Sequence, residues 1–460
     1  MLFTSATFVV FFAIVLLLWH LLPFRFAKFM LLVASLIFYG YWYPPLMVLL
    51  LFSGLVDYIA GARIVSDPAH RRSWLAASLA TNLGVLFFFK YSAFAVDNLN
   101  AVFGLVNVPL HVEWSIILPL GISFYTFQSM SYTIDIYKGT LKPTKSLADF
   151  FMYLAFFPQL VAGPIVRAVD FLPQVLKRHP VTYADVEEGV YRITRGFFLK
   201  MVIANNIAGS VETIFAHDVS RLDLWAAWMG ALFFGIQIFC DFAGYSDIAI
   251  GLARLFGFRL LENFSSPYTA GSLQDFWRRW HISLSTWFRD YVYVPLGGNR
   301  TGQWRASANL FVVFVISGIW HGANWTFLLW GAMHGLALLM ERRLKNFWRS
   351  RQRPAMPAAL ATTLVLIFVV FAWVPFRAPS IAYIPVLAAD DLRFASSTDS
   401  LFLDGLPWLL LYIGTQTIMF LRERNPGLSR ILSPKLEMWV FFALIVLIPS
   451  ATADFIYFDF

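Results

Sequence analysis

His321 is the residue whose surroundings point most directly to chemistry. It lies in the segment SGIWHGANW, residues 317–325, between apolar runs and far from any cluster of charged residues. An ionisable side chain in such surroundings is costly to bury and is, by default, a functional hypothesis. A neutral imidazole can take a proton from a hydroxyl group at physiological pH, because its unperturbed pKa is about 6.5. The segment therefore predicts a general base at His321.

A structural role for the same segment stays open. His321 could instead be a packing histidine that is hydrogen-bonded to a neighbouring carbonyl. Four glycines around it, at 318, 322, 331 and 335, have the small-xxx-small spacing of closely packed membrane helices. Close helix packing and catalysis are compatible.

His281 is the second candidate. It lies in DFWRRWHISLSTWFRD, residues 275–290, where helical spacing gathers the apolar side chains on one face. We expect a helix lying in the cytoplasmic interface of a membrane. His281 is then either an interfacial residue without chemistry or a residue at the entrance of a path that leads to His321.

Two carboxylates lie in an otherwise apolar run, CDFAGYSD at 240–247. Asp241 and Asp247 could line a polar cavity or orient a histidine, or they could cap a broken helix. Cys240 is interpreted as a small buried hydrophobe. The usual motifs of serine hydrolases, P-loop ATPases and zinc proteases do not occur, and no metal site is expected.

The composition requires helices that are embedded in a membrane. Of the 460 residues, 59% are hydrophobic and only 13% are charged, whereas soluble chains carry about 25% charged residues. The sequence therefore predicts an all-α polytopic membrane protein and excludes a soluble fold. A single cysteine excludes an internal disulfide.

The charge distribution predicts an orientation. Six lysines and arginines lie within 342–353, whereas the loops at 97–113, 210–224 and 377–406 are nearly free of them. Basic residues near the ends of spans stay in the cytoplasm. The net charge of +8 is thus attributed to orientation and not to nucleic-acid binding, and both termini are expected in the periplasm.

One membrane domain, 1–460, with about 11–13 membrane helices and additional interfacial helices is expected, since a span needs about 20 apolar residues. Two apolar segments, 149–166 and 238–258, are interrupted by proline, glycine or aspartate. Broken helices persist at membrane depth only beside protein or a water-filled cavity. These segments therefore predict re-entrant or broken helices around a polar cavity, or else loops on the cytoplasmic face.

Several long motifs together resemble the membrane-bound O-acyltransferase (MBOAT) family, and within it the bacterial alginate O-acetyltransferase branch. They are residues 275–300, WHGANW at 320–325, FPQLVAGP at 157–164, CDFAGYSD at 240–247 and the aromatic tail at 455–460. The likeness extends over nearly the whole chain. The near-invariant histidine of the branch falls on His321, and its second histidine falls on His281.

The resemblance implies a helical bundle around a central tunnel, in a multi-pass protein of the bacterial inner membrane. It implies that an acetyl group from a cytoplasmic thioester, acetyl-CoA, crosses the membrane and O-acetylates an exopolysaccharide such as alginate, by way of a periplasmic SGNH-type acetyltransferase. His321 would be the general base and His281 would orient or polarise the donor. No permanently bound cofactor is expected. The expected tunnel residues are Trp320, Asn324, Asp241, Asp247 and Arg289.

Other functions stay open at this stage. A sister branch of the family transfers D-alanine from a carrier protein towards a cell-wall polymer. Broken helices and ionisable groups within the membrane also occur in transporters and lipid flippases. The protein could also be an assembly platform without turnover of its own.

Overall fold

A computed structural model describes most of the chain. The described residues are 1–105, 112, 114, 116–161, 163–216, 224–300, 302–352, 354, 356–384, 398–425, 428, 432–451, 453, 455 and 456. Every regular element among them is a helix, which confirms the predicted all-α fold class. The predicted external loops at 97–113, 210–224 and 377–406 and the tail beyond Ile456 lie partly or wholly outside the described residues.

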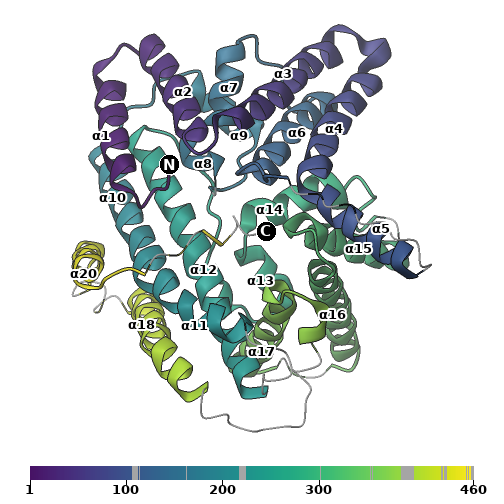
Figure 1. Cartoon of the computed structure of the whole chain (residues 1–460), viewed down its shortest axis with the longest axis vertical. Coiled ribbons are helices and arrows are strands. Elements are labelled where there is room, and N and C mark those ends of the chain that lie inside the picture. The colour runs from purple at the N-terminus through teal and green to yellow at the C-terminus, as the bar shows by residue number, and fades with distance from the viewer. Residues whose placement is uncertain are drawn as a thin grey trace. The chain divides into compact units, whose positions relative to one another are not determined.

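The chain divides into two compact units, and the first contains Met1–Gly189 and Ala249–Leu261. Its helices, purple to blue in Figure 1, come mainly from the N-terminal part of the chain. They are α1 (Ala6–Leu21), α2 (Phe24–Gly40), α3 (Pro44–Ser66), α4 (Arg71–Leu86), α5 (Ser92–Leu105), α6 (Ile122–Lys138), α7 (Leu147–Ala155), α8 (Phe157–Leu160) and α9 (Ala168–Val175). A π-helical segment, Phe87–Tyr91, joins α4 to α5.

A buried carboxylate ties three helices of this first unit together. Asp57 on α3 is fully buried and accepts hydrogen bonds from Ser78 (2.5 Å) and Asn82 (2.7 Å) on α4, and from Ser129 on α6. Burying a carboxylate is costly unless hydrogen bonds compensate it. The cluster thus fixes α3, α4 and α6 to one another.

The two segments predicted to be broken behave differently. Residues 149–166 are interrupted: α7 ends at Ala155, the four-residue α8 follows, and the chain beyond α8 is irregular. In contrast, 238–258 belongs largely to one continuous helix, α12 (Leu224–Leu255), so the expectation of a break there is wrong. Glycine and aspartate lower helix propensity, but packing overrides that preference in a helix that is buried along most of its length.

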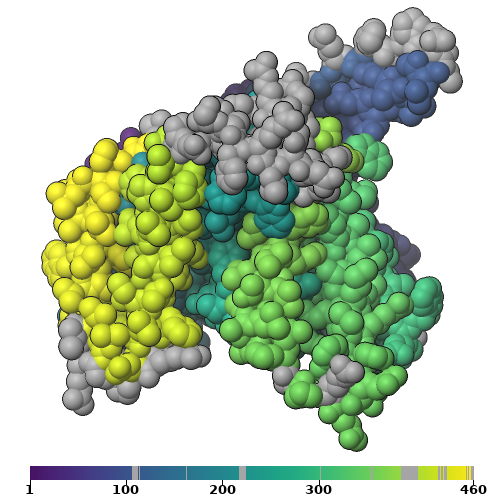
Figure 2. Space-filling model, turned by 90° about the horizontal axis from the view of Figure 1, so that it is seen from below, coloured from purple at the N-terminus to yellow at the C-terminus, as the bar shows by residue number. Residues whose placement is uncertain are grey.

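The second unit, Val190–Ile248 and Glu262–Phe460, holds both candidate histidines. In Figure 2 its yellow C-terminal helices and its green helices α16 and α17 lie on either side of the teal segments. Helices α10 and α12 contribute residues to both units. The remaining helices are α10 (Tyr183–Phe197), α11 (Asn205–Ala216), α13 (Leu273–Arg279), α14 (Ile282–Phe288), α15 (Gln303–His321), α16 (Trp325–Ser350), α17 (Ala358–Arg377), α18 (Thr398–Arg424) and α20 (Pro434–Leu447).

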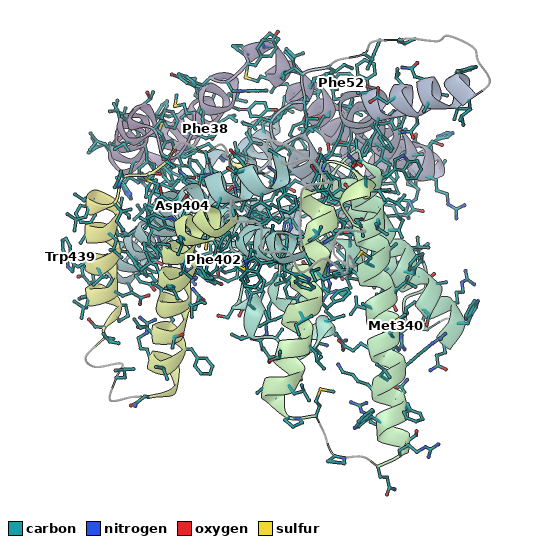
Figure 3. The ribbon with its side chains drawn as sticks, turned by 60° about the horizontal axis from the view of Figure 1, so that its bottom comes forward. Phe38, Phe52, Met340, Phe402, Asp404 and Trp439 are labelled. Atoms are coloured by element: carbon teal, nitrogen blue, oxygen red, sulfur yellow. The ribbon has the colours of Figure 1, made fainter. Side chains whose placement is uncertain are left out.

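Helices α15 and α16 pack closely because glycines face each other at their contact. A Cβ atom at Gly318 would lie 2.3 Å from the carbonyl oxygen of Phe327, and one at Gly331 would lie 2.3 Å from that of Phe314. The small-xxx-small prediction is therefore confirmed at this pair. Met340 of α16, labelled in Figure 3, is exposed and lines a surface groove together with Trp304 and Phe311 of α15.

In the part of the chain that the structure describes, four helical stretches are long and apolar enough to cross a bilayer: Pro44–Ser66, Pro68–Leu105, Leu224–Leu255 and Ala358–Arg377. Large apolar side chains are exposed on many helices, and Trp439 on α20 is one of them (Figure 3). Such surfaces suit lipid and not water. The number of 11–13 membrane helices in a single domain stays a prediction.

The glycine contact gives a test of how α15 and α16 are held. We expect Gly318→Ala to lower the free energy of unfolding by about 1–3 kcal/mol, because the added methyl group overpacks the interface. Gly414→Ala on α18 is the matched control, since a Cβ atom there meets nothing within 4 Å. Thermal unfolding of both variants in detergent measures the difference, and an equally stable Gly318→Ala protein would contradict the close contact.

Candidate active site

The two candidate histidines lie on either side of one tryptophan. The His281 and Trp320 ring centroids are 6.2 Å apart, and those of Trp320 and His321 are 4.9 Å apart. All three rings are buried. One of the two interpretations of the sequence places His281 at the entrance of a path to His321, and the structure brings the two residues into one aromatic cluster.

The connection between α15 and α16 positions His321. Helix α15 ends at His321, and Gly322 follows where a Cβ atom would lie 2.0 Å from the Phe327 ring. Asn324 then caps α16: its Oδ1 accepts the Thr326 N–H at 3.1 Å, and its Nδ2 donates to the Pro379 carbonyl at 3.2 Å. Asn324, a predicted tunnel residue, thus shapes the turn behind the histidine.

Aromatic rings surround the imidazole of His321. Besides Trp320, the rings of Trp330 on α16 and Phe376 on α17 lie 5.1 and 5.2 Å from it, both near perpendicular. Only 3% of the residue is exposed. An imidazole so enclosed is screened from bulk water, which strengthens its interaction with any polar group admitted beside it.

The sequence predicts a continuous helix through His281. In the structure, His281 instead lies at a break between α13 and α14. Its φ is +42°, a left-handed conformation that side chains with a Cβ rarely adopt. Asn263 stabilises the break. Its carbonyl accepts the Ile282 N–H at 2.9 Å and its Oδ1 accepts the Ser283 hydroxyl at 2.8 Å.

The His281 side chain is completely buried within the protein. Its ring meets Phe242 of α12 edge to face at 4.6 Å. Loss of hydration lowers the pKa of the His281 imidazole to about 3. The ring is therefore neutral at physiological pH and can donate or accept a hydrogen bond without carrying charge.

Asp241 forms a buried ion pair instead of standing alone in the apolar run. Its carboxylate lies 2.7 Å from the Lys200 Nζ, and it also accepts the Ile456 N–H at 2.7 Å. The same end of the chain packs Phe455 against Tyr245, with ring centroids 4.2 Å apart. Asp241 thus fixes the C-terminal segment to α12, one residue away from the Phe242 that touches His281.

Asp247 and Arg289 are also engaged by other charges. Asp247 lies 2.9 Å from Arg192 and 3.3 Å from Arg195, and Arg192 also pairs with Glu262. Arg289 is 60% exposed and pairs with the neighbouring Asp290 at 2.6 Å. A role for either residue in a tunnel stays a prediction.

A basic cavity of about 460 Å³ opens beside α15 and α16. Its mouth carries Arg342, Lys345 and Arg349, which lie on one face of α16, with Glu341 paired to Lys345 at 2.5 Å. Its apolar inner wall includes Trp277 and Phe314. Among the described residues it combines positive charge at one end with aromatic rings at the other.

Sequence reasoning missed the residues that connect this cavity to His321. Trp277 lines the cavity and its ring lies 5.1 Å from that of His334, whose ring lies 4.8 Å from Trp330. Trp330 in turn contacts His321. The sequence neighbours of His334 are mostly apolar, so the sequence alone does not indicate a polar contact for it. Its polar partner, the indole N–H of Trp277, comes from another helix.

The model of the membrane-bound O-acyltransferase family matches residues 140–385. The chain is 41% identical to the "Probable alginate O-acetylase AlgI" of Azotobacter vinelandii, over 79% of this chain and 72% of the relative. It is 38% identical to a peptidoglycan O-acetyltransferase of Helicobacter pylori (77% and 72%), and 29% identical to a teichoic acid D-alanyltransferase of Bacillus subtilis (58% and 69%).

The buried neutral state of His281 makes stability depend on pH. Its pKa is lower in the folded protein than in the unfolded chain, so the unfolded chain binds more protons below about pH 6.5 and stability falls as the pH falls. We expect His281 to lower the free energy of unfolding by up to about 1.4 kcal/mol for each pH unit between pH 6 and pH 4. Thermal unfolding of wild type and His281→Gln at pH 7 and pH 5 measures it. The variant should show the smaller pH-dependent loss, and identical losses would contradict a neutral buried imidazole.

Proposed function

The chain belongs to the membrane-bound O-acyltransferase family and is an acyltransferase, and we propose that it transfers an acetyl group from a thioester donor to a hydroxyl group for O-acetylation of an exopolysaccharide such as alginate. The observation that carries this proposal is the row of contacting side chains between the basic cavity and His321. The names of the two O-acetylating relatives support acetyl as the transferred group.

In the proposed reaction His321 is the general base. Its neutral imidazole takes the proton of the acceptor hydroxyl while the hydroxyl oxygen attacks the thioester carbonyl carbon. The tetrahedral intermediate collapses, the C–S bond breaks, and the departing thiolate takes the proton from the imidazolium. The products are an ester, a free thiol and a neutral imidazole, so atoms and charge balance. The aromatic enclosure of His321 supports this role, because it keeps competing water from the thioester.

His281 is assigned the polarising role. Its pKa of about 3 means that the imidazole stays neutral and acts through a hydrogen bond, not as a cation. The break between α13 and α14 directs it towards the same tryptophan that His321 contacts. A backbone strained at such a position is a known mark of functional sites.

The basic cavity is the proposed site of the donor, acetyl-CoA. Its three cations would bind phosphate groups, and arginine does so bidentately. Arg342 and Trp330 are 12 residues apart on α16, which corresponds to about 18 Å along the helix axis. This distance leaves room for an extended pantetheine arm to reach inwards. The cations belong to the cluster that the positive-inside rule assigns to the cytoplasm. We therefore propose that acetyl-CoA binds from the cytoplasmic side of the inner membrane. Both chain termini would then lie in the periplasm.

A periplasmic SGNH-type acetyltransferase is the proposed next acceptor of the acetyl group. A polymer is too large to enter a cluster of buried rings, so a separate acceptor on the outer side suits the enclosed position of His321. Transfer of D-alanine from a carrier protein is less well supported, because the relative with that name is less similar and matches a smaller share of this chain.

Replacement of His321 tests the reaction directly. With reconstituted protein, labelled acetyl-CoA and the acceptor, we expect His321→Gln to lower turnover by about 10²- to 10⁴-fold, the usual contribution of a general base. His70→Gln is the matched control, since His70 is exposed in the first unit. Both variants should elute from size exclusion like wild type. Normal turnover in a folded His321→Gln protein would exclude the catalytic role.

The donor cavity is tested by two neighbouring arginines on α16. Arg342 lines the cavity, whereas Arg343 lies on another face of the helix and lines a shallow apolar groove. We expect Arg342→Gln to raise the KM for acetyl-CoA about three- to ten-fold, and Arg343→Gln to leave it unchanged. Acetyl-pantetheine, which lacks the phosphates, should show no difference among the proteins. Equal effects of the two substitutions would argue against phosphate binding in this cavity.

A further inference from the structure

Four aromatic side chains form a continuous layer between the cavity and the candidate general base. Trp277 is partly exposed to the cavity, while Trp330 and His334 are 1% and 2% exposed. The rings of Trp277 and Trp330 meet at 5.7 Å with an interplanar angle of 74°. Phe314 supports the layer from α15, 5.1 Å from Trp277. Any acyl group that travels from the cavity to His321 has to pass this layer.

A hydrogen bond fixes the orientation of the tryptophan that faces the cavity. The Trp277 indole N–H donates to the Nδ1 of His334 at 3.3 Å. Indole nitrogen is only a donor, so Nδ1 is the acceptor and the neutral imidazole carries its proton on Nε2. His334 is itself held between Trp330 and Phe368, whose ring lies 5.2 Å away. The acceptor is therefore fixed, and the indole plane is fixed with it.

We propose that Trp277 determines the length of the acyl group that the enzyme accepts, and that His334 is a positioning residue that acts through Trp277. The indole ring lines the cavity on the side where its rings contact Trp330 and His334, so a longer acyl chain directed towards His321 would overlap it. This inference rests on the proposed thioester chemistry and adds a specificity residue to it. The donor class is a short acyl thioester, and longer chains are rejected by steric overlap with the indole.

The expected size of the effect follows from the buried hydrocarbon. A butyryl group has two more methylenes than an acetyl group, and each buried methylene is worth about 0.8 kcal/mol. Space opened at Trp277 should therefore improve butyryl relative to acetyl by on the order of tenfold. A ring that only stabilises the fold would change both substrates equally.

The experiment compares kcat/KM for acetyl-CoA and butyryl-CoA in reconstituted protein. We expect Trp277→Leu to raise the butyryl-to-acetyl ratio about tenfold. His334→Phe, which keeps the ring but removes the acceptor, should raise the ratio less, and His334→Gln, which restores an acceptor, should return it towards wild type. Trp304→Leu is the control, because Trp304 lies on α15 and is 81% exposed, and its ratio should not change.

Each result decides the proposal. An unchanged ratio in folded Trp277→Leu protein, with both substrates affected alike, overturns it. If Trp277→Leu fails to fold, Trp277→Phe and Phe314→Leu take its place, because both remove bulk from the same layer. An unchanged butyryl-to-acetyl ratio in both of these variants would overturn the proposal equally. Wild-type protein that turns over neither thioester would contradict the proposed function itself, whereas wild-type acetyl turnover with constant ratios contradicts only the role of Trp277.

Discussion

The site depends on one constraint, which is that imidazoles must be kept neutral and correctly oriented among aromatic rings. Charged imidazolium is costly to bury in such surroundings, so burial selects the neutral form, and the lowered pKa of His281 expresses this directly. Neutral imidazole is the form that accepts a proton from a hydroxyl group. Contacts with aromatic rings orient the imidazoles without changing their protonation state, whereas charged partners would change it. In the proposed reaction, the dense packing of Trp320, Trp330 and Phe376 around His321 is thus part of the chemistry.

Much of the fold and one residue of the site could be predicted from the sequence. His321 was identifiable because a titratable residue lay in a long apolar run, and the glycines beside it predicted the close contact of α15 with α16. Local patterns of this kind report on burial and on close approach, which are properties of single helices or helix pairs. They were sufficient for the helical class and for the choice of His321 as the candidate general base, which stays a prediction.

The features that the sequence did not predict depend on contacts between segments that are distant in the sequence. Helical periodicity predicted a continuous helix through His281, and the break there requires Asn263, a residue 18 positions earlier, to accept its backbone and side-chain donors. His334 had apolar sequence neighbours and gained a polar partner only through folding. Asp241 and Asp247 attracted notice as isolated carboxylates, but basic residues of α10 and of the π-helical turn that follows it, Phe198–Ala204, pair with them. Such pairs bring specificity of arrangement more than stability, because desolvation offsets their attraction.

Separation of charge from catalysis explains why the cavity and the histidines are distinct. Phosphate binding needs exposed cations and water at the cavity mouth, whereas a thioester awaiting attack by a scarce hydroxyl must be kept from water. If the cations lay beside His321, they would draw in solvent, and this water could hydrolyse the thioester before the acceptor arrived. In the proposed reaction an aromatic layer between the two regions meets both demands, since the thioester end of the uncharged pantetheine arm would pass it while the charged phosphates stay in the cavity. Arg289, exposed and paired with Asp290, is not among the residues that line that cavity, and its expected role in a tunnel stays a prediction.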